Sequence, residues 1–171
     1  MNEPLGEMFR YNRWANDRLL GVCAELTEAQ LDGRVTGTFG SIRRTLVHTI
    51  GSQDVFLWRL ASGDTVLQAR AAAMRGPWWD FAALRTFSER SSQELLVAAL
   101  NLESDHAVSL PPWEGQVDVV NTSFVLLHAL YHGIEHRGQV CTTLTQIGLT
   151  PPDLDGWGYR GALSPQPAPR L

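Results

Sequence analysis

Histidine side chains at helical spacing are the residues of this sequence best suited to do chemistry. Three of its five histidines, His128, His132 and His136, follow one another at four-residue intervals. A helix turns by about 100° per residue, so a four-residue step returns to within about 40° of the same face. Two imidazoles one turn apart can bind a common metal ion, and an HxxxH pair on a helix is typical of such sites. The spacing therefore predicts that two of these histidines share a metal ion.

A third ligand must come from another part of the chain. His48 is the only other histidine expected in the middle of a helix, and helices two and four of an antiparallel bundle can meet across the core. Three neutral imidazoles leave further coordination positions to water or substrate, as in catalytic sites. The alternative is that these histidines are ordinary core or boundary side chains. Spacing alone leaves both interpretations open.

Four long helices are needed to position these histidines. Ser41 is expected to cap the second helix, and the side chains of Asn121, Thr122 and Ser123 to cap the fourth. We therefore predict an all-α fold, an antiparallel four-helix bundle. Apolar residues recur at helical intervals over residues 5–26, 41–60, 81–101 and 124–147.

The connections between the helices contain shorter elements. Residues 27–30 have the form of a capping box, and residues 71–74 predict a turn or so of helix. Two segments, 107–110 and 116–119, flank a turn at Pro111–Gly115 and predict a small β-hairpin before the last helix. We expect a single domain over residues 1–160 and a flexible C-terminal tail over residues 161–171.

Composition and charge exclude several classes of protein. The 171 residues are 44% hydrophobic and 19% charged, which is typical of a globular domain rather than a disordered chain. A formal net charge of −4 without a basic cluster argues against nucleic-acid binding. No apolar run is long enough for a signal peptide or a membrane span, so we expect a cytoplasmic protein without membrane contact. The two cysteines, Cys23 and Cys141, are far apart and predict no disulfide.

Three segments of the sequence resemble the DinB family. They are residues 11–16 (Tyr-Asn-Arg-Trp-Ala-Asn), residues 40–48 ending at His48, and residues 128–139 with the ending His-Arg-Gly-Gln. The resemblance covers nearly the whole chain and implies a DinB/YfiT-like four-helix bundle and a homodimer. It further implies that His48, His132 and His136 bind a divalent metal ion such as zinc or nickel, with His128 as an accessory group.

Other side chains near the histidines could support them. Gln139 is close enough in helical phase to orient a ligand or a bound water, whereas Glu135 is expected to point away. Asp54 and Gln53 could hydrogen-bond an imidazole, although a solvated helix face is the simpler interpretation. Arg137 could also orient the site or pair with a surface carboxylate.

Packing explains the remaining unusual residues most simply. Gly138 suggests the close approach of another helix or chain. The six tryptophans are core or interface anchors, or line a pocket. We do not expect a Cys141–His136 nucleophile, because the two residues are about 140° apart around the helix.

The first functional hypothesis is a metal-dependent enzyme acting on a small-molecule substrate. The ion would lower the pKa of a bound thiol or water and present it to an electrophile. The resemblance favours a thiol S-transferase that uses a low-molecular-weight thiol of the bacillithiol or mycothiol type in stress or detoxification. A metal-dependent hydrolase is the alternative, and His128 and Gln139 are the candidate catalytic residues. Two further hypotheses are a non-catalytic metal- or ligand-binding stress-response protein and a helical protein with purely structural histidines.

Overall fold

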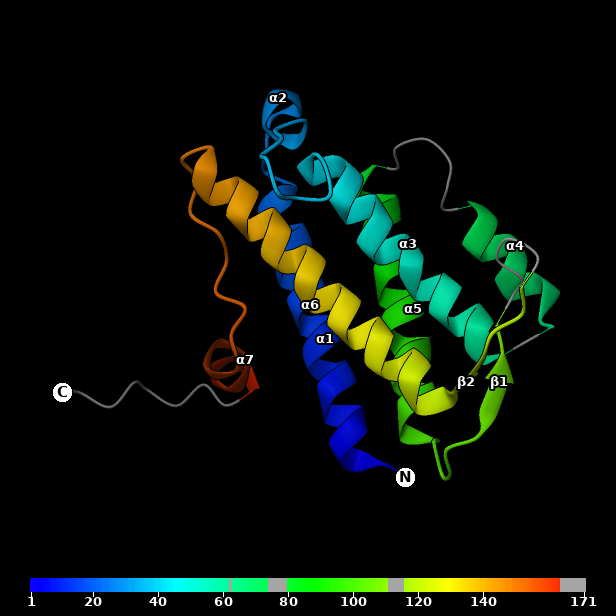
Figure 1. The fold of residues 1–171 in the computed structure, drawn as a ribbon. Coiled ribbons are helices and arrows are strands. Elements are labelled where there is room, and N and C mark those ends of the chain that lie inside the picture. The colour runs from blue at the N-terminus through cyan, green and yellow to red at the C-terminus, as the bar shows by residue number, and fades with distance from the viewer. Residues whose placement is uncertain (62, 74–79, 111–115, 164–171) are drawn as a thin grey trace.

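The computed structural model describes residues 1–61, 63–73, 80–110 and 116–163, and four long helices dominate this part of the chain (Figure 1). Helix α1 packs against α5, and α3 packs against α6. The all-α bundle predicted from the sequence is therefore confirmed. The helices are α1 (Glu3–Cys23), α2 (Glu28–Leu31), α3 (Ile42–Leu60), α4 (Thr65–Ala73), α5 (Phe81–Leu100), α6 (Thr122–Gln146) and α7 (Gly156–Leu163).

Local side chains fix where several helices begin. The Ser41 side chain accepts a hydrogen bond from the Arg44 backbone N–H at the start of α3, as predicted. Thr27 and Gln30 form the predicted capping box of α2. Beyond the C-terminal end of α6, Gly148 has a φ of +83°, a left-handed conformation that favours glycine after a helix.

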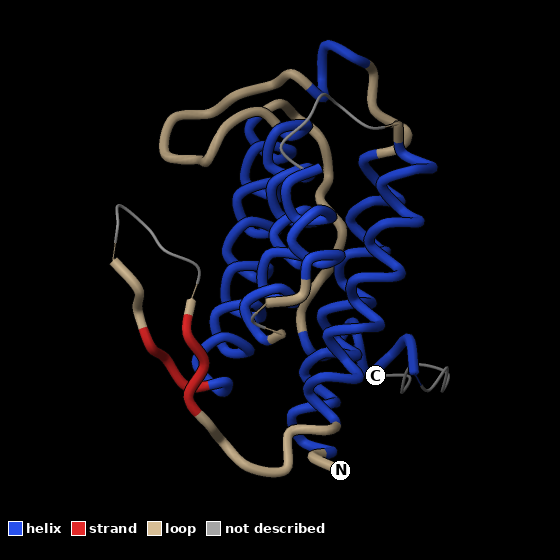
Figure 2. The backbone as a smooth tube through the Cα atoms, turned by 90° about the vertical axis from the view of Figure 1, so that its right-hand side faces the viewer, coloured by secondary structure: helices blue, strands red, loops and turns tan. Residues whose placement is uncertain are grey.

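A hairpin connects α5 to α6. Strands β1 (Ala107–Ser109) and β2 (Val119–Asn121) pair antiparallel, with Val108 opposite Val120, and lie beside the start of α6 (Figure 2). The first strand was predicted correctly apart from its last residue. The second was predicted at residues 116–119 but begins only at Val119, and the turn at residues 111–115 lies outside the described residues.

The cap of α6 comes from a residue that the sequence analysis did not consider. Asn121, Thr122 and Ser123 were predicted to cap this helix themselves, and that prediction was wrong: Asn121 makes no side-chain cap. Instead, the Asp105 carboxylate accepts hydrogen bonds from the Ser123 backbone N–H (2.9 Å) and hydroxyl (2.7 Å), the Thr122 hydroxyl (2.9 Å) and the Asn121 amide (3.0 Å). These bonds, led by the backbone one, lower the pKa of Asp105 to about 2. An anion at a helix N-terminus is also favoured by the helix dipole.

This cap predicts a pH-dependent difference between the wild type and Asp105→Asn. The folded-state pKa of Asp105 is lower than its ordinary value of 3.8. The carboxylate therefore stabilises the fold fully above pH 3.8, and this stabilisation is lost as the pH falls toward about 2. We expect the wild type to be more stable at pH 7 and the difference to shrink below about pH 4. Urea unfolding followed by circular dichroism measures this, and an equal difference at pH 7 and pH 2.5 would contradict it.

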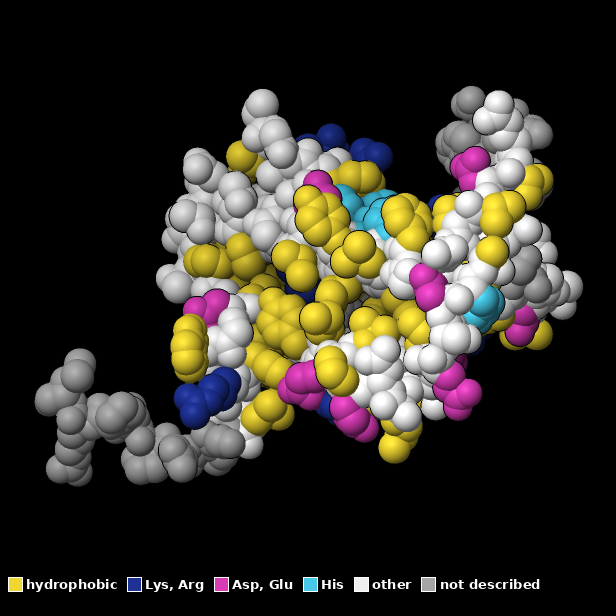
Figure 3. Space-filling model, turned by 60° about the horizontal axis from the view of Figure 1, so that its bottom comes forward, with side chains coloured by type: hydrophobic (Ala, Val, Ile, Leu, Met, Phe, Trp, Pro, Cys, Tyr) yellow, Lys and Arg dark blue, Asp and Glu magenta, His cyan; other side chains and the backbone are white. Residues whose placement is uncertain are grey.

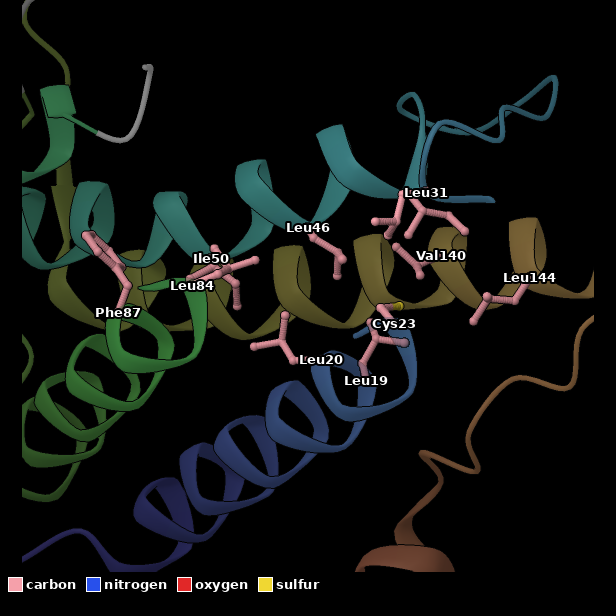
Figure 4. Packing of buried hydrophobic residues seen from close by; sticks show 11 residues of the cluster. Leu19, Leu20, Cys23, Leu31, Leu46, Ile50, Leu84, Phe87, Val140 and Leu144 are labelled. Atoms are coloured by element: carbon pink, nitrogen blue, oxygen red, sulfur yellow. The ribbon is translucent and has the colours of Figure 1, made fainter. Parts of the chain in front are cut away.

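Two apolar clusters fill the bundle, one at each end. Both draw on all four long helices, and Figure 4 shows side chains of the first pointing toward one another from these helices. The first cluster includes Leu19, Leu20, Cys23, Ile42, Leu46, Ile50, Leu84, Val140 and Leu144. The second includes Phe9, Phe56, Leu57, Leu95, Leu96, Ala99, Val125, Leu126 and Ala129.

A chain of buried polar side chains lies between the two clusters. The Arg137 guanidinium on α6 donates to Asn12 and Asn16 on α1, each at 2.7 Å. Asn16 donates to Ser92 on α5 (3.5 Å), whose hydroxyl donates to Gln53 on α3 (2.8 Å). All four long helices are thus joined at mid-length. Because unpaired polar groups are costly when buried, this chain fixes the helices in one register.

Two short helices were not predicted as such. Helix α4 is longer than the turn expected at residues 71–74, and α7 covers residues 161–163 of the predicted tail; residues 164–171 lie outside the described part of the chain. Long-range contacts hold both helices. Arg70 on α4 bonds to Asp54 on α3, and the Tyr159 hydroxyl on α7 donates to Glu7 on α1. None of the helices in the described residues combines the length and apolarity needed to cross a bilayer.

Candidate metal centre

Three histidines from two helices meet at one side of the bundle. His48 lies in the middle of α3, and His132 and His136 lie on successive turns of α6, the helix that packs against α3. The Nε2 atoms of His48 and His132 are 3.0 Å apart. One ligand atom from each of the three residues lies within 4.8 Å of the others. The structure thus brings together the three residues that the sequence singled out.

Aromatic rings enclose these histidines. Phe39, in the loop before α3, stacks on the His48 ring at a centroid distance of 4.1 Å and meets the His136 ring edge-on at 5.1 Å. Phe56 meets the His132 ring edge-on at 5.5 Å. Figure 3 shows histidine side chains reaching the surface among hydrophobic ones. The imidazoles are therefore held between rigid, apolar side chains.

This environment keeps the imidazoles of His48 and His132 neutral. Burial, followed by the charge of His136, lowers the pKa of His48 to about 4. The same causes, with smaller contributions from neighbouring cationic groups, lower the pKa of His132 to about 3. Both side chains are therefore neutral near pH 7, which is the protonation state that binds a metal ion.

The donor set and its spacing fit a divalent metal ion. Zinc binds imidazole nitrogen at about 2.0–2.1 Å, so two ligands of a tetrahedral site are about 3.3 Å apart. The 3.0 Å between the Nε2 atoms of His48 and His132 is close to that value. Three nitrogen ligands also leave a coordination position open. His48, His132 and His136 are accordingly the residues that would hold the ion.

Gln139 orients His136. Its side-chain oxygen lies 2.9 Å from His136 Nδ1 and also accepts the Phe39 backbone N–H at 3.1 Å. Because this oxygen is an acceptor, His136 Nδ1 carries the hydrogen and Nε2 keeps its lone pair for a metal ion. The predicted role of Gln139 as an orienting residue agrees with this contact.

Removing this contact should weaken metal binding. In Gln139→Ala we expect zinc affinity to fall about tenfold to hundredfold, because His136 loses the partner that fixes its tautomer. Gln146→Ala, an exposed glutamine of the same helix, is the control and should bind like the wild type. Competition with a chromogenic chelator measures both affinities, and equal values for the two variants would contradict the assigned role.

A cleft of about 250 Å³ opens beside the histidines, between α3 and α4. Its walls are mainly apolar, and His48 and Arg59 contribute its charged or titratable groups. The lining residues are Val47, His48, Gly51, Ser52, Val55, Phe56, Arg59 and Ala71. The cleft provides room for a small molecule next to the metal ligands.

His128 lies next to the three histidines without joining them. Its ring centre is 6.0 Å from that of His132 and 5.0 Å from that of Phe56. Burial lowers its pKa, and it is not among the residues whose ligand atoms converge. Its predicted role as an accessory group remains a prediction. Glu135 is exposed, as expected for a side chain that points away.

Three other side chains have roles that the sequence analysis did not anticipate. Asp54 is fully buried and pairs with Arg70 and Arg90, so both its predicted imidazole contact and the solvated face were wrong. Gln53 is also buried and bonds to Ser92. Arg137 is 2% exposed within the polar chain, so the predicted pairing with a surface carboxylate was wrong.

The structure tests part of what was predicted for the packing residues, and the contacts with a second chain stay a prediction. Among the described residues, nothing lies within 4 Å of a side chain added at Gly138, so no helix of the same chain approaches there. Trp14 and Trp58 are half-buried, Trp157 is 75% exposed, and none of the three lines the cleft. The tryptophans at 78, 79 and 113 lie outside the described residues. Burial raises the pKa of Cys141, which agrees with setting a thiolate nucleophile aside.

Sequence reasoning missed Phe39 and Arg59. Phe39 lies in a loop, and no periodic pattern marks a loop residue that folds back onto a helix. Arg59 did have a signal, because eleven residues after His48 a helix returns to within about 20° of the same face. Applying the helical phase to α3 as well as α6 would have found it.

Comparison with known proteins identifies a family for this chain. No curated protein matches this sequence. The family model described as DinB family matches residues 1–167, which is nearly the whole length of the 171-residue chain. The chain therefore belongs to the DinB family.

Proposed function

We propose that this protein is a metal-dependent enzyme that transfers a low-molecular-weight thiol to an electrophilic substrate. The observation that carries the proposal is the convergence of His48, His132 and His136 beside a cleft that His48 lines and that is large enough for a small molecule. A divalent metal ion, zinc or nickel in this proposal, lowers the pKa of a bound thiol or water and so supplies a nucleophile near neutral pH.

The protein contributes orientation and an apolar surrounding. Gln139 holds the His136 ring, and Phe39 and Phe56 flank the imidazoles. In the reaction, the thiol sulfur forms a bond to the electrophilic carbon, the leaving group departs with its electron pair, and the thiol proton passes to solvent. The apolar walls of the cleft hold the electrophile near the sulfur and exclude competing water.

The surroundings of the histidines favour thiol transfer over hydrolysis. In metalloproteases with an HExxH motif, a carboxylate beside the metal serves as the general base for water. Among the described residues, no carboxylate hydrogen-bonds to His48, His132 or His136. A thiol acidified by a metal ion needs no such base, because it is already the nucleophile as thiolate.

The test is thiol transfer to the chromogenic electrophile 1-chloro-2,4-dinitrobenzene. Protein stripped of metal and reloaded with zinc or nickel should catalyse thioether formation with bacillithiol, and stripped protein should not. His132→Ala should lack the activity under both conditions. Equal rates with and without metal would contradict the proposal, and metal-dependent ester hydrolysis without any thiol would favour the hydrolase instead.

A further inference from the structure

An arginine that has no acidic partner among the described residues lies in the same cleft as His48. Arg59 lines the cleft together with His48 and Phe56, and its guanidinium carbon is 5.6 Å from the centre of the Phe56 ring. The side chain is half-buried. Over the parts of the chain that the structure describes, no carboxylate lies within 4.0 Å of it.

Arg70, on the helix across the cleft, does have acidic partners. Arg70, on α4, is held between the carboxylates of Asp54 and Glu94. At Arg59, burial lowers the pKa, and no carboxylate of the described residues offsets the loss of water. Keeping an unpaired cation half-buried is unfavourable, and an anion from solution would relieve that cost.

We propose that Arg59 binds a carboxylate of the substrate, so that the site selects thiols bearing a carboxylate at the end opposite the sulfur. The inference rests on the proposed function, which places the sulfur at the three histidines. The single charge of a carboxylate suits one guanidinium, which binds it through two parallel N–H donors. The apolar side chains of Val55, Phe56 and Ala71 line the space that the connecting part of the molecule would occupy.

The distances limit the length of such a thiol. The ring centre of Phe56 is 5.6 Å from the Arg59 guanidinium carbon and 5.5 Å from the ring centre of His132. Added together, these place the guanidinium at most about 11 Å from the His132 ring. A medium-length ω-mercapto acid such as 6-mercaptohexanoate is therefore long enough to extend from a sulfur at the three histidines to a carboxylate at Arg59.

The experiment uses cobalt-loaded protein, in which binding of a thiolate to the metal gives a charge-transfer absorption. Titration compares 6-mercaptohexanoate with 6-mercapto-1-hexanol, which has the same chain without the charge. The wild type should bind the acid at least about tenfold more tightly. In Arg59→Gln this preference should vanish while the affinity for the alcohol is unchanged, and Arg59→Lys should keep part of it.

The controls separate this inference from the proposed function. Arg160→Gln removes an exposed arginine on α7 and should keep the full preference for the acid. Cobalt content and circular dichroism verify that each variant is folded and loaded. Equal affinities for the two thiols in the wild type, or an unchanged preference in Arg59→Gln, would overturn the role of Arg59 alone. Failure of both thiols to change the cobalt spectrum would overturn the thiol chemistry and this inference together.

Discussion

Replacing His132 by alanine should lower the affinity for zinc by more than about a hundredfold. Loss of a residue that only hydrogen-bonds to a metal ligand costs up to about a hundredfold, and loss of the ligand itself should cost more. His132 is close to both other histidines: its Nε2 is 3.0 Å from that of His48, and its ring centre is 4.4 Å from that of His136. The variant keeps only two converging imidazoles, which cannot complete a stable site. Competition against a chromogenic chelator at pH 7 measures the loss.

The matched control is His106→Ala, which removes an exposed histidine near the hairpin. Its ring nitrogen lies 3.2 Å from the Ser104 carbonyl oxygen, and it is not among the converging ligands, so zinc affinity should equal that of the wild type. His128→Ala should have a smaller effect than His132→Ala if His128 is an accessory group. A zinc affinity in His132→Ala within a few-fold of the wild type would contradict the assignment of the ligands.

The second large effect is expected at Asp54, which joins three helices. Its carboxylate accepts hydrogen bonds from Arg70 on α4 (2.6 and 3.1 Å) and from Arg90 on α5 (3.0 Å), and the side chain is fully buried. Removing one partner of a buried ion pair leaves charge uncompensated and costs about 3 kcal/mol. Urea unfolding of Asp54→Asn should show a loss of that size.

Glu94→Gln is the control for this prediction. Glu94 pairs with the same Arg70, but its side chain is 38% exposed, so the variant should lose less than about 1 kcal/mol. Asp54→Asn should also loosen α4, which forms one wall of the cleft through Ala71. A free energy of unfolding for Asp54→Asn within 0.5 kcal/mol of the wild type would contradict this account of the pair.

Features that depend on helical period could be predicted from the sequence. The apolar spacing located the four long helices, and the four-residue interval between His132 and His136 placed them on one face. Ser41 and the capping box at Thr27 act locally, and both predictions are confirmed. His48 followed from the expected meeting of two helices in an antiparallel bundle.

Features that depend on contacts distant in sequence could not be predicted. Asp105 caps α6 from sixteen to eighteen residues away, where local capping rules do not reach. Arg137 and Asp54 looked like surface residues because charged side chains usually are, yet each is buried with partners on other helices. Helix α4 has a weak apolar pattern, and its Arg70 is fixed by two carboxylates on other helices.

The polar chain across the core links the fold to the candidate metal centre. Arg137 directly follows His136, and its bonds to Asn12 and Asn16 fix this turn of α6 against α1. On the other side of the bundle, Gln139 fixes the His136 ring and the Phe39 loop. The position of His136 is thus determined from both sides, as a preorganised metal site requires.

The most direct test of the central claim is the metal content of untagged protein, measured by inductively coupled plasma mass spectrometry. The account predicts about one equivalent of zinc, nickel or another divalent metal in the wild type, lost in both His48→Ala and His132→Ala. Wild-type protein that holds no metal even after reconstitution, or variants that retain a full equivalent, would contradict it.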